Sequence, residues 1–181
     1  MDDDDKESED EAAEPAPDAA QDEGAELREV SKEELKQILA AHKTWLETDG
    51  KEGEQADLSR TNLQGANLFR ADLREANLFR ADLREAVLSF AKLQGASLAG
   101  ADLQGAKLNS ANLQRADLGG ANVEEANLHR ADLQGTVLTN ARNLTRKQLN
   151  KACGSDKTKL PDDLADYQMK PCPKPAQSPS N

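Results

Sequence analysis

The sequence predicts an all-β solenoid that is closed at each end by a short α-helix. Three observations support this prediction. Residues 56–140 repeat with a period of five, and helix-capping motifs flank the repeats on both sides. Aromatic residues make up only 3% of the chain, too few for an ordinary mixed core. The core must therefore consist mainly of Leu and Ala, and its open ends need cover from other parts of the chain.

The repeat is unusually regular. From Ala56 onward, 85 residues divide into 17 five-residue units without any insertion. The third position of a unit is Leu except at Val123, and the first is Ala except at Thr61 and Thr136. An α-helix would need an apolar period of 3.6 residues. Five residues instead suit a short extended piece followed by a turn, because Asn, Asp and Gly recur where turns need them.

Four such units return the chain above its starting point if each unit forms one side of a square. The first and third positions then point inward, and the other three face water. Leu and Ala alternate inside, so the interior fills without aromatic residues. At the strand spacing of about 4.8 Å the rod is roughly 20 Å long. One inward column would comprise Leu58, Leu78, Leu98, Leu118 and Leu138.

The A-[D/N]-L-x-x signature, unbroken from Ala56 to Asn140, resembles that of the pentapeptide-repeat family. The resemblance implies a right-handed quadrilateral β-helix. The stretch from Ala152 to Pro161 is similar to a closing segment of many bacterial members. Members of the family have several unrelated roles, so the fold by itself says little about function.

An N-terminal capping helix is predicted within residues 26–50, followed by a linker over 51–55. Ser31 and Glu34 form a capping-box pattern, and Gly50 can end the helix. Its apolar face would either cover the first coil, which is the favoured interpretation, or dock another protein. That face comprises Leu35, Ile38, Leu39, Trp45 and Leu46.

A second cap is predicted over residues 141–170, where Thr145 and Gln148 repeat the capping pattern before a short helix. From Pro171 the composition turns to Pro, Lys and Ser, so we expect residues 171–181 to be disordered.

Negative charge is concentrated at the N-terminus. The formal net charge of the chain is −11, and residues 1–25 contain twelve acids and one base. The repeats sum to only −1. Residues 1–25 contain no large apolar residue after Met1, so we expect a disordered acidic tail. Its first six residues, Met1 to Lys6, resemble an engineered protease-recognition tag.

No apolar run is long enough for a signal peptide or a membrane span. We therefore expect a cytoplasmic protein, or a periplasmic or exported one if a tag has replaced a native signal. Cys153 and Cys172 have no matching His pair, which argues against zinc. Two free thiols are favoured, and a single disulfide is the alternative if the chain is exported.

The predicted surface contains few residues that are candidates for catalysis or for binding a metal or cofactor. His42 is in the predicted helix, and His129 is at an outward repeat position with no nucleophile in register. No phosphate loop, metal motif or dinucleotide fingerprint is present, so we expect neither an enzyme nor a bound cofactor or metal.

Three of the five aromatic residues occupy outward positions. Phe69 and Phe90 fall on one face in successive coils and should touch, with Arg70 beside them, whereas Phe79 falls on the opposite face. Exposed aromatic residues with a neighbouring Arg are typical of partner contacts. The alternative is that the tail or a terminal helix folds over them.

We therefore predict a non-enzymatic protein-binding or scaffold module that is a monomer or weak dimer, with another protein as its partner. Nucleic acid is an unlikely partner, because the solenoid has no basic stripe. A second hypothesis is binding of a type II topoisomerase by DNA mimicry, as in quinolone-resistance members of the family. The near-neutral repeats, the absence of loops and the short rod argue against it. A structural protein of another role is the third alternative.

Overall fold

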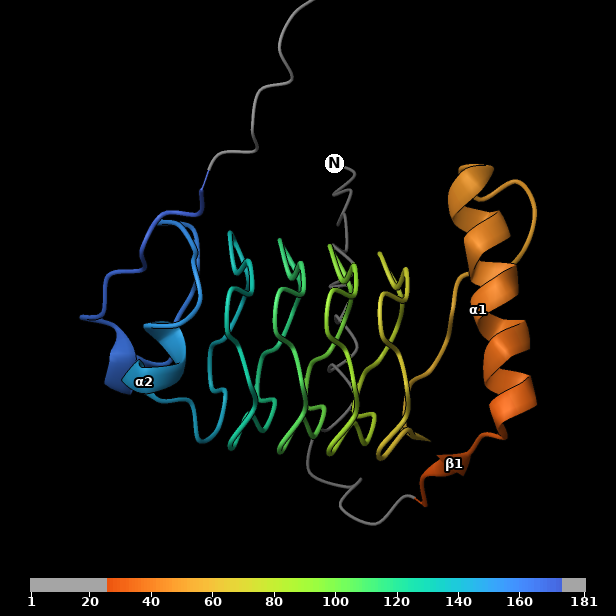
Figure 1. Ribbon diagram of the computed structural model, residues 1–181, viewed down its shortest axis with the longest axis horizontal. Coiled ribbons are helices and arrows are strands. Elements are labelled where there is room, and N and C mark those ends of the chain that lie inside the picture. The colour runs from red at the N-terminus through yellow and green to blue at the C-terminus, as the bar shows by residue number, and fades with distance from the viewer. Residues whose placement is uncertain (1–25, 174–181) are drawn as a thin grey trace, which may run out of the picture.

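The computed structural model describes residues 26–173, and the predicted acidic tail, its tag-like start and residues 174–181 lie outside this part. Along the described chain the helices and strands are β1 (Arg28–Glu29), α1 (Lys32–Glu47), β2 (Thr61–Asn62), α2 (Arg146–Leu149) and the 3-10 helix η1 (Asp162–Leu164). Figure 1 shows a stack of coils between α1 at one end and α2 at the other. The predicted repeat solenoid is confirmed.

Successive coils pair in parallel at a spacing of twenty residues. The isolated bridges begin with Asp57↔Asn77 and continue in steps of five residues to Asn122↔Arg142. At the first of them Leu58 N donates to the carbonyl of Asn77 at 2.7 Å, and Asn77 N donates to that of Ala56 at 2.9 Å. Each side of a coil therefore contributes only a short extended piece, and hydrogen bonds between coils satisfy its backbone.

A tight turn closes each unit. In the unit 66–70 the N–H of the next residue, Ala71, donates to the Leu68 carbonyl at 3.0 Å. The fifth residue of all 17 units has a positive φ, and in eleven of them it is not glycine. A positive φ at the third turn residue is the requirement of a type II turn. The turns thus hold many ordinary side chains in a conformation that they rarely adopt.

The interior consists of inward Leu and Ala side chains. The column Leu58, Leu78, Leu98, Leu118 and Leu138 is at most 1% exposed. Thr136 replaces the usual Ala at a first position and is fully buried, and its hydroxyl donates to the Leu113 carbonyl at 2.7 Å. The stack therefore has an apolar core without aromatic side chains, and each buried hydroxyl in it needs a partner.

The N-terminal segment packs against the first coil. Ser31 caps α1 by accepting a hydrogen bond from Glu34 N at 3.1 Å, while the Glu34 carboxylate lies 4.0 Å from Arg28 instead of returning to the cap. Val30 and three apolar side chains of α1, those of Leu35, Ile38 and Leu39, pack against the core.

The sequence predicted a helix within residues 26–50 that is capped at Ser31, and the structure adds the short strand β1 before α1. β1 pairs in parallel with β2, with Arg28 opposite Thr61. The reason is that the first coil leaves the backbone groups of Thr61 and Asn62 without a partner on one side, and a two-residue segment satisfies them.

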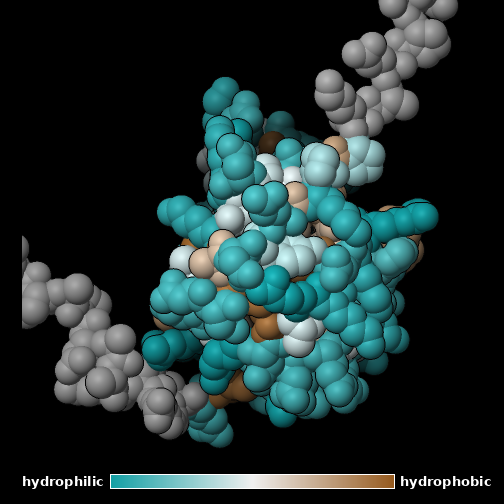
Figure 2. Space-filling view, turned by 90° about the vertical axis from the view of Figure 1, so that its left-hand side faces the viewer, coloured by the Kyte–Doolittle hydropathy of each residue, from teal (hydrophilic) through white to brown (hydrophobic). Residues whose placement is uncertain are grey.

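At the opposite end Thr145 and Gln148 form a complete capping box at the start of α2. The chain then returns to the stack, where Cys153 pairs with Asp132 and Pro171 pairs with Gly154. The sequence placed the start of a disordered tail at residue 171. That boundary is wrong, because Pro171 belongs to this pairing. Figure 2 shows this end of the molecule covered largely by hydrophilic side chains, with small hydrophobic spots between them.

Candidate functional site

Phe69, Arg70 and Phe90 form one contact group, which we call the aromatic patch. It lies on the side of the solenoid built by the stacked units 66–70, 86–90, 106–110 and 126–130, the aromatic face. The ring centroids of Phe69 and Phe90 are 5.8 Å apart with planes at 78°. The guanidinium carbon of Arg70 lies 5.1 Å from the Phe69 centroid and 5.7 Å from the Phe90 centroid.

Both phenylalanines of the patch are exposed. Phe69 is 48% and Phe90 49% exposed, and within residues 26–173 no other large hydrophobic side chain reaches this level. Edge-to-face rings and an Arg over an aromatic ring are both favourable arrangements. The described chain therefore leaves uncovered a preformed apolar surface with a cation at its edge.

The backbone under the patch is firmly held. Phe69 N donates to Asn67 Oδ1 at 3.2 Å, and Phe90 N donates to the Asn109 carbonyl at 3.1 Å. Ser89 is buried beside Phe90, and its hydroxyl donates to Asn109 Oδ1 at 2.8 Å. Phe90 itself has φ of 61°, which is unusual for a bulky residue. These contacts hold the backbone from which both rings project before any partner arrives.

Phe79 does not join this surface. It lies in the unit 76–80, half a coil away from the patch, and is only partly exposed. The guanidinium carbon of Arg80 lies 5.2 Å from its ring centroid. Phe79 was also a candidate for partner binding, on the opposite face, and the structure places it there, apart from Phe69 and Phe90. Phe79 is therefore a control position rather than part of the patch.

Cys153 and Cys172 form a disulfide, so the favoured interpretation of two free thiols is wrong and the alternative applies. Asp132 Oδ1 lies 3.2 Å from Cys172 Sγ. These three residues are the single group of potential metal ligands within residues 26–173. Because the two sulfurs are bonded to each other, the group offers a cation one carboxylate only.

The two histidines have different surroundings. His42 is the fully buried residue of α1, where Nδ1 accepts a hydrogen bond from Ala56 N at 3.1 Å and the ring stacks on Trp45. Burial lowers the pKa of His42, and this effect outweighs the nearby Arg74 carbonyl, which acts in the opposite direction. His42 thus joins α1 to the start of the first coil as a neutral hydrogen-bond acceptor. His129 is exposed.

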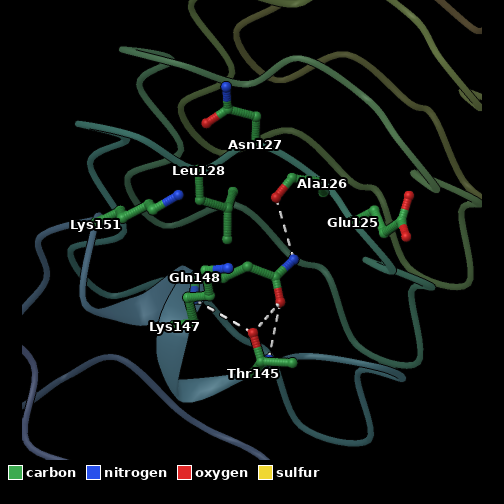
Figure 3. A pocket seen from close by; sticks show the side chains of 8 residues that line it. All are labelled: Glu125, Ala126, Asn127, Leu128, Thr145, Lys147, Gln148 and Lys151. Carbon is green, nitrogen blue, oxygen red and sulfur yellow. Dashed lines mark hydrogen bonds between the residues drawn. The ribbon is translucent and has the colours of Figure 1, made fainter.

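A hollow of about 330 Å³ lies between the last coil and α2 (Figure 3). Gln148 dominates it. The Gln148 amide donates to the carbonyls of Val123 at 2.7 Å and Ala126 at 3.1 Å, and its oxygen accepts from Thr145 N at 2.9 Å. These contacts occupy the Gln148 amide and attach α2 to the solenoid. The hollow therefore marks a structural contact between α2 and the last coil rather than a ligand site. It is lined by Glu125, Ala126, Asn127, Leu128, Thr145, Lys147, Gln148 and Lys151.

Two carboxylates on other sides of the solenoid are neutralised within the chain. Asp72 accepts hydrogen bonds from Arg74 at 2.7 Å and from Lys92 at 3.1 Å. Burial opposes ionisation of Asp72, but these two cations outweigh it and lower its pKa. Asp82 is held in the same way by Arg84, and its pKa is also lowered. These ion pairs neutralise the two carboxylates, so they leave little net charge at these positions for a partner to recognise.

Comparison with known proteins agrees with this architecture. The family model described as "Pentapeptide repeats" matches residues 54–84, 81–120 and 106–142, with eight copies. The chain is therefore a member of the pentapeptide-repeat family. Among curated proteins no match was found.

Several solved structures are similar. HetL, a pentapeptide repeat protein involved in heterocyst differentiation regulation in the cyanobacterium Nostoc sp. strain PCC 7120, is 44% identical, with 47% of this chain and 36% of HetL covered and a TM-score of 0.46. Rfr23 from the cyanobacterium Cyanothece 51142 is 36% identical, with 52% and 63% covered and a TM-score of 0.48. The chain thus spans less than two thirds of either relative.

A third similar structure is a pentapeptide repeat protein of the Arabidopsis thaliana thylakoid lumen. It is 31% identical, with 55% of this chain and 74% of that protein covered and a TM-score of 0.32. In the part of this chain that the structure describes, no helix is both long enough and apolar enough to cross a membrane.

Proposed function

We propose that this protein is a non-enzymatic binding or scaffold module that presents the aromatic patch to a partner protein. The observation that carries the proposal is the exposed, preformed contact group of Phe69, Phe90 and Arg70. Aromatic residues and Arg dominate the energetics of protein interfaces. A patch held by a rigid backbone also loses little conformational entropy when it binds.

We also infer that the coil is right-handed, and that α1 and the C-terminal segment act as end caps. The apolar contacts of Leu35 and Ile38 with the core and the attachment of α2 through Gln148 support the capping role. Caps prevent the open edges of the stack from pairing with other chains. A monomer or weak dimer follows from this arrangement.

The Cys153–Cys172 disulfide favours the second of the two expected locations, an oxidising compartment outside the cytoplasm. Disulfides persist in such compartments and are rare where thiols are kept reduced.

DNA mimicry of a type II topoisomerase substrate has less support as an alternative function. The repeats sum to −1, and no loop interrupts their 17 units. A mimic of duplex DNA would need negative charge over much of its surface, because the phosphate backbone dominates DNA recognition.

The proposal is tested by affinity recovery of partners with the native chain and with a Phe69→Ser, Phe90→Ser double variant. We expect the double variant to lose about 2 kcal/mol or more of binding free energy, since both anchors are removed. Its melting temperature should not change, because neither ring is part of the core.

Phe79→Ser is the matched control, because it removes the same side chain from the opposite face. It should leave binding intact. If the partner still binds the double variant but is lost after removal of residues 1–25, the aromatic patch is not the binding site.

A further inference from the structure

Charge is distributed unevenly around the solenoid. The aromatic face contains three cations, Arg70, Lys107 and Arg130, and its four units include no carboxylate. The neighbouring side, built by the units 61–65, 81–85, 101–105 and 121–125, contains five acids and one base. The charges of all repeats sum to nearly zero, so this separation is not visible in the total. The solenoid nevertheless has one basic face.

Among residues 26–173, the three cations of the aromatic face lack the carboxylate partners that Arg74, Arg84 and Lys92 have. Arg74 pairs with Asp72, and Arg84 pairs with Asp82. Within residues 26–173, by contrast, no ion pair involves a cation of the aromatic face, and all three side chains are exposed. Unpaired cations on one rigid face present an attractive potential to an anionic ligand.

The cations and the aromatic rings lie on the same face of the solenoid, in coils stacked on one another. Lys107 stacks between Val87 and Asn127, and Arg70 and Arg130 occupy the same unit position three coils apart. At the coil spacing of about 4.8 Å this separation is roughly 14 Å, the length of about four extended residues. Phe90 lies between them, one coil above Arg70.

We propose that the aromatic face binds an acidic segment of a partner protein. Carboxylates of the segment would contact Lys107 and Arg130, and an apolar side chain beside them would pack on Phe69 and Phe90. This inference rests on the proposed function and deepens it, since it assigns the chemistry of the partner. Complementary charge of this kind mainly sets partner choice and the association rate.

Nucleic acid fits this face less well than an acidic protein segment. A long polyanion would extend beyond the three cations onto the neighbouring acidic side, which would repel it. Three cations release few counterions, whereas stable nucleic-acid binding uses many phosphate contacts. A short acidic segment needs only the contacts that the face offers.

The test uses fluorescence anisotropy with the full chain and a short labelled peptide of Glu, Asp and Ser around one Trp. The comparison probe replaces every acid by its amide. We expect the acidic probe to bind at least about tenfold more tightly than the amide probe, and this preference should shrink as salt is raised from about 50 to 300 mM.

Charge reversal identifies the face. Arg130→Glu or Lys107→Glu should each weaken binding of the acidic probe about fivefold, because an attraction becomes a repulsion. Arg115→Glu is the matched control for Arg130→Glu. It changes the net charge equally at the same unit position with the same positive φ, but on another side of the solenoid, and it should alter binding less than about twofold.

The outcomes separate this inference from the proposed function. If the phenylalanine double variant weakens binding while Arg130→Glu behaves like Arg115→Glu, the aromatic patch is supported as the binding site. The inference that the partner segment is acidic is then overturned. If the charge reversals weaken binding and the double variant does not, the acidic segment is supported and the aromatic anchor fails. Equal binding of both probes, or none, overturns the inference.

Three further measurements would reveal a different occupant of the aromatic face. Tighter binding of labelled oligothymidine, lost in the same charge reversals, would identify nucleic acid instead. Concentration-dependent self-association that Arg130→Glu abolishes would identify a second copy of this chain. Zero-length crosslinks from Lys107 to acids within residues 1–25 would identify its own acidic segment. Each of these three results overturns an external acidic partner.

Discussion

Leu98→Asp is the most direct perturbation of the solenoid core. Leu98 is fully buried at the middle of its column, with Leu78 and Leu118 directly below and above, and its N–H donates to the Asp117 carbonyl at 2.6 Å. Ala99 is the next residue and is only half-buried at an outward position. Ala99→Asp therefore introduces the same side chain one residue away, without entering the core.

The expected loss follows from two contributions. Removing a fully buried Leu from the core costs about 1.5–3 kcal/mol of transfer free energy. A buried carboxyl group without a partner adds about 1–3 kcal/mol even in its neutral form. The sum of about 2.5–6 kcal/mol is a large share of the stability of an ordinary domain. Ala99→Asp should change stability by no more than about 0.5 kcal/mol.

Thermal unfolding followed by circular dichroism measures the difference, and pH gives a second readout. Burial raises the folded-state pKa of the new carboxyl above its unfolded value, so the loss in Leu98→Asp should grow as pH rises through that folded pKa. Leu98→Asn is the control without this dependence. Similar melting temperatures for Leu98→Asp and Ala99→Asp would show that the inward and outward assignment is wrong.

Two further predictions concern single buried or partly buried groups. Burial lowers the pKa of His42, so the unfolded chain binds this proton more readily, and stability should fall as pH drops from about 7.5 to below the unfolded pKa of about 6.5. Melting temperatures across pH should show a shallower fall in His42→Gln, and an equal fall would assign the effect to other groups. Asp132→Asn should accelerate reduction of the disulfide by dithiothreitol, because the Asp132 carboxylate, 3.2 Å from Cys172 Sγ, repels an incoming thiolate. Alkylation and mass measurement follow the reduction, and unchanged rates would contradict this role of the carboxylate.

The sequence predicted the parts of the fold that depend on repetition or on local chemistry. A period of five with Leu at one inward position leaves few arrangements other than a stacked coil, because every unit must bury the same side. The capping box of Thr145 and Gln148 was equally predictable, since it depends on four consecutive residues. The contact between Phe69 and Phe90 followed from the same register.

Features that depend on distant contacts were not predictable. β1 consists of the exposed pair Arg28–Glu29, which has no strand pattern of its own and is held by the edge of β2. The pairing of Cys153 with Cys172 depends on how the C-terminal chain returns to the last coil, which the spacing of the cysteines does not specify. Phe79 is half-buried although it occupies an outward repeat position, and Arg80 lies over its ring.

The conformation of the turns offers a further test of which surface residues serve function. Arg130 has φ of 58° at the fifth position of its unit, where six other units have glycine. A side chain in this conformation costs about 1–2 kcal/mol. Arg130 is exposed and does not recover this cost through burial in the core, so its effects on stability and on binding can be measured separately.

Arg130→Gly should therefore stabilise the fold while weakening the proposed binding. Relief of the strained φ exceeds the cost of about 0.5–1 kcal/mol for the extra freedom of glycine in the unfolded chain, which leaves a gain of about 0.5 kcal/mol. Arg115→Gly relieves the same strain, with φ of 57°, on another side of the solenoid. Both variants should melt slightly above the native chain, and only Arg130→Gly should bind the acidic peptide less tightly. A lower melting temperature for both would contradict the strain estimate, and equal binding of the peptide by both variants would contradict the role of Arg130.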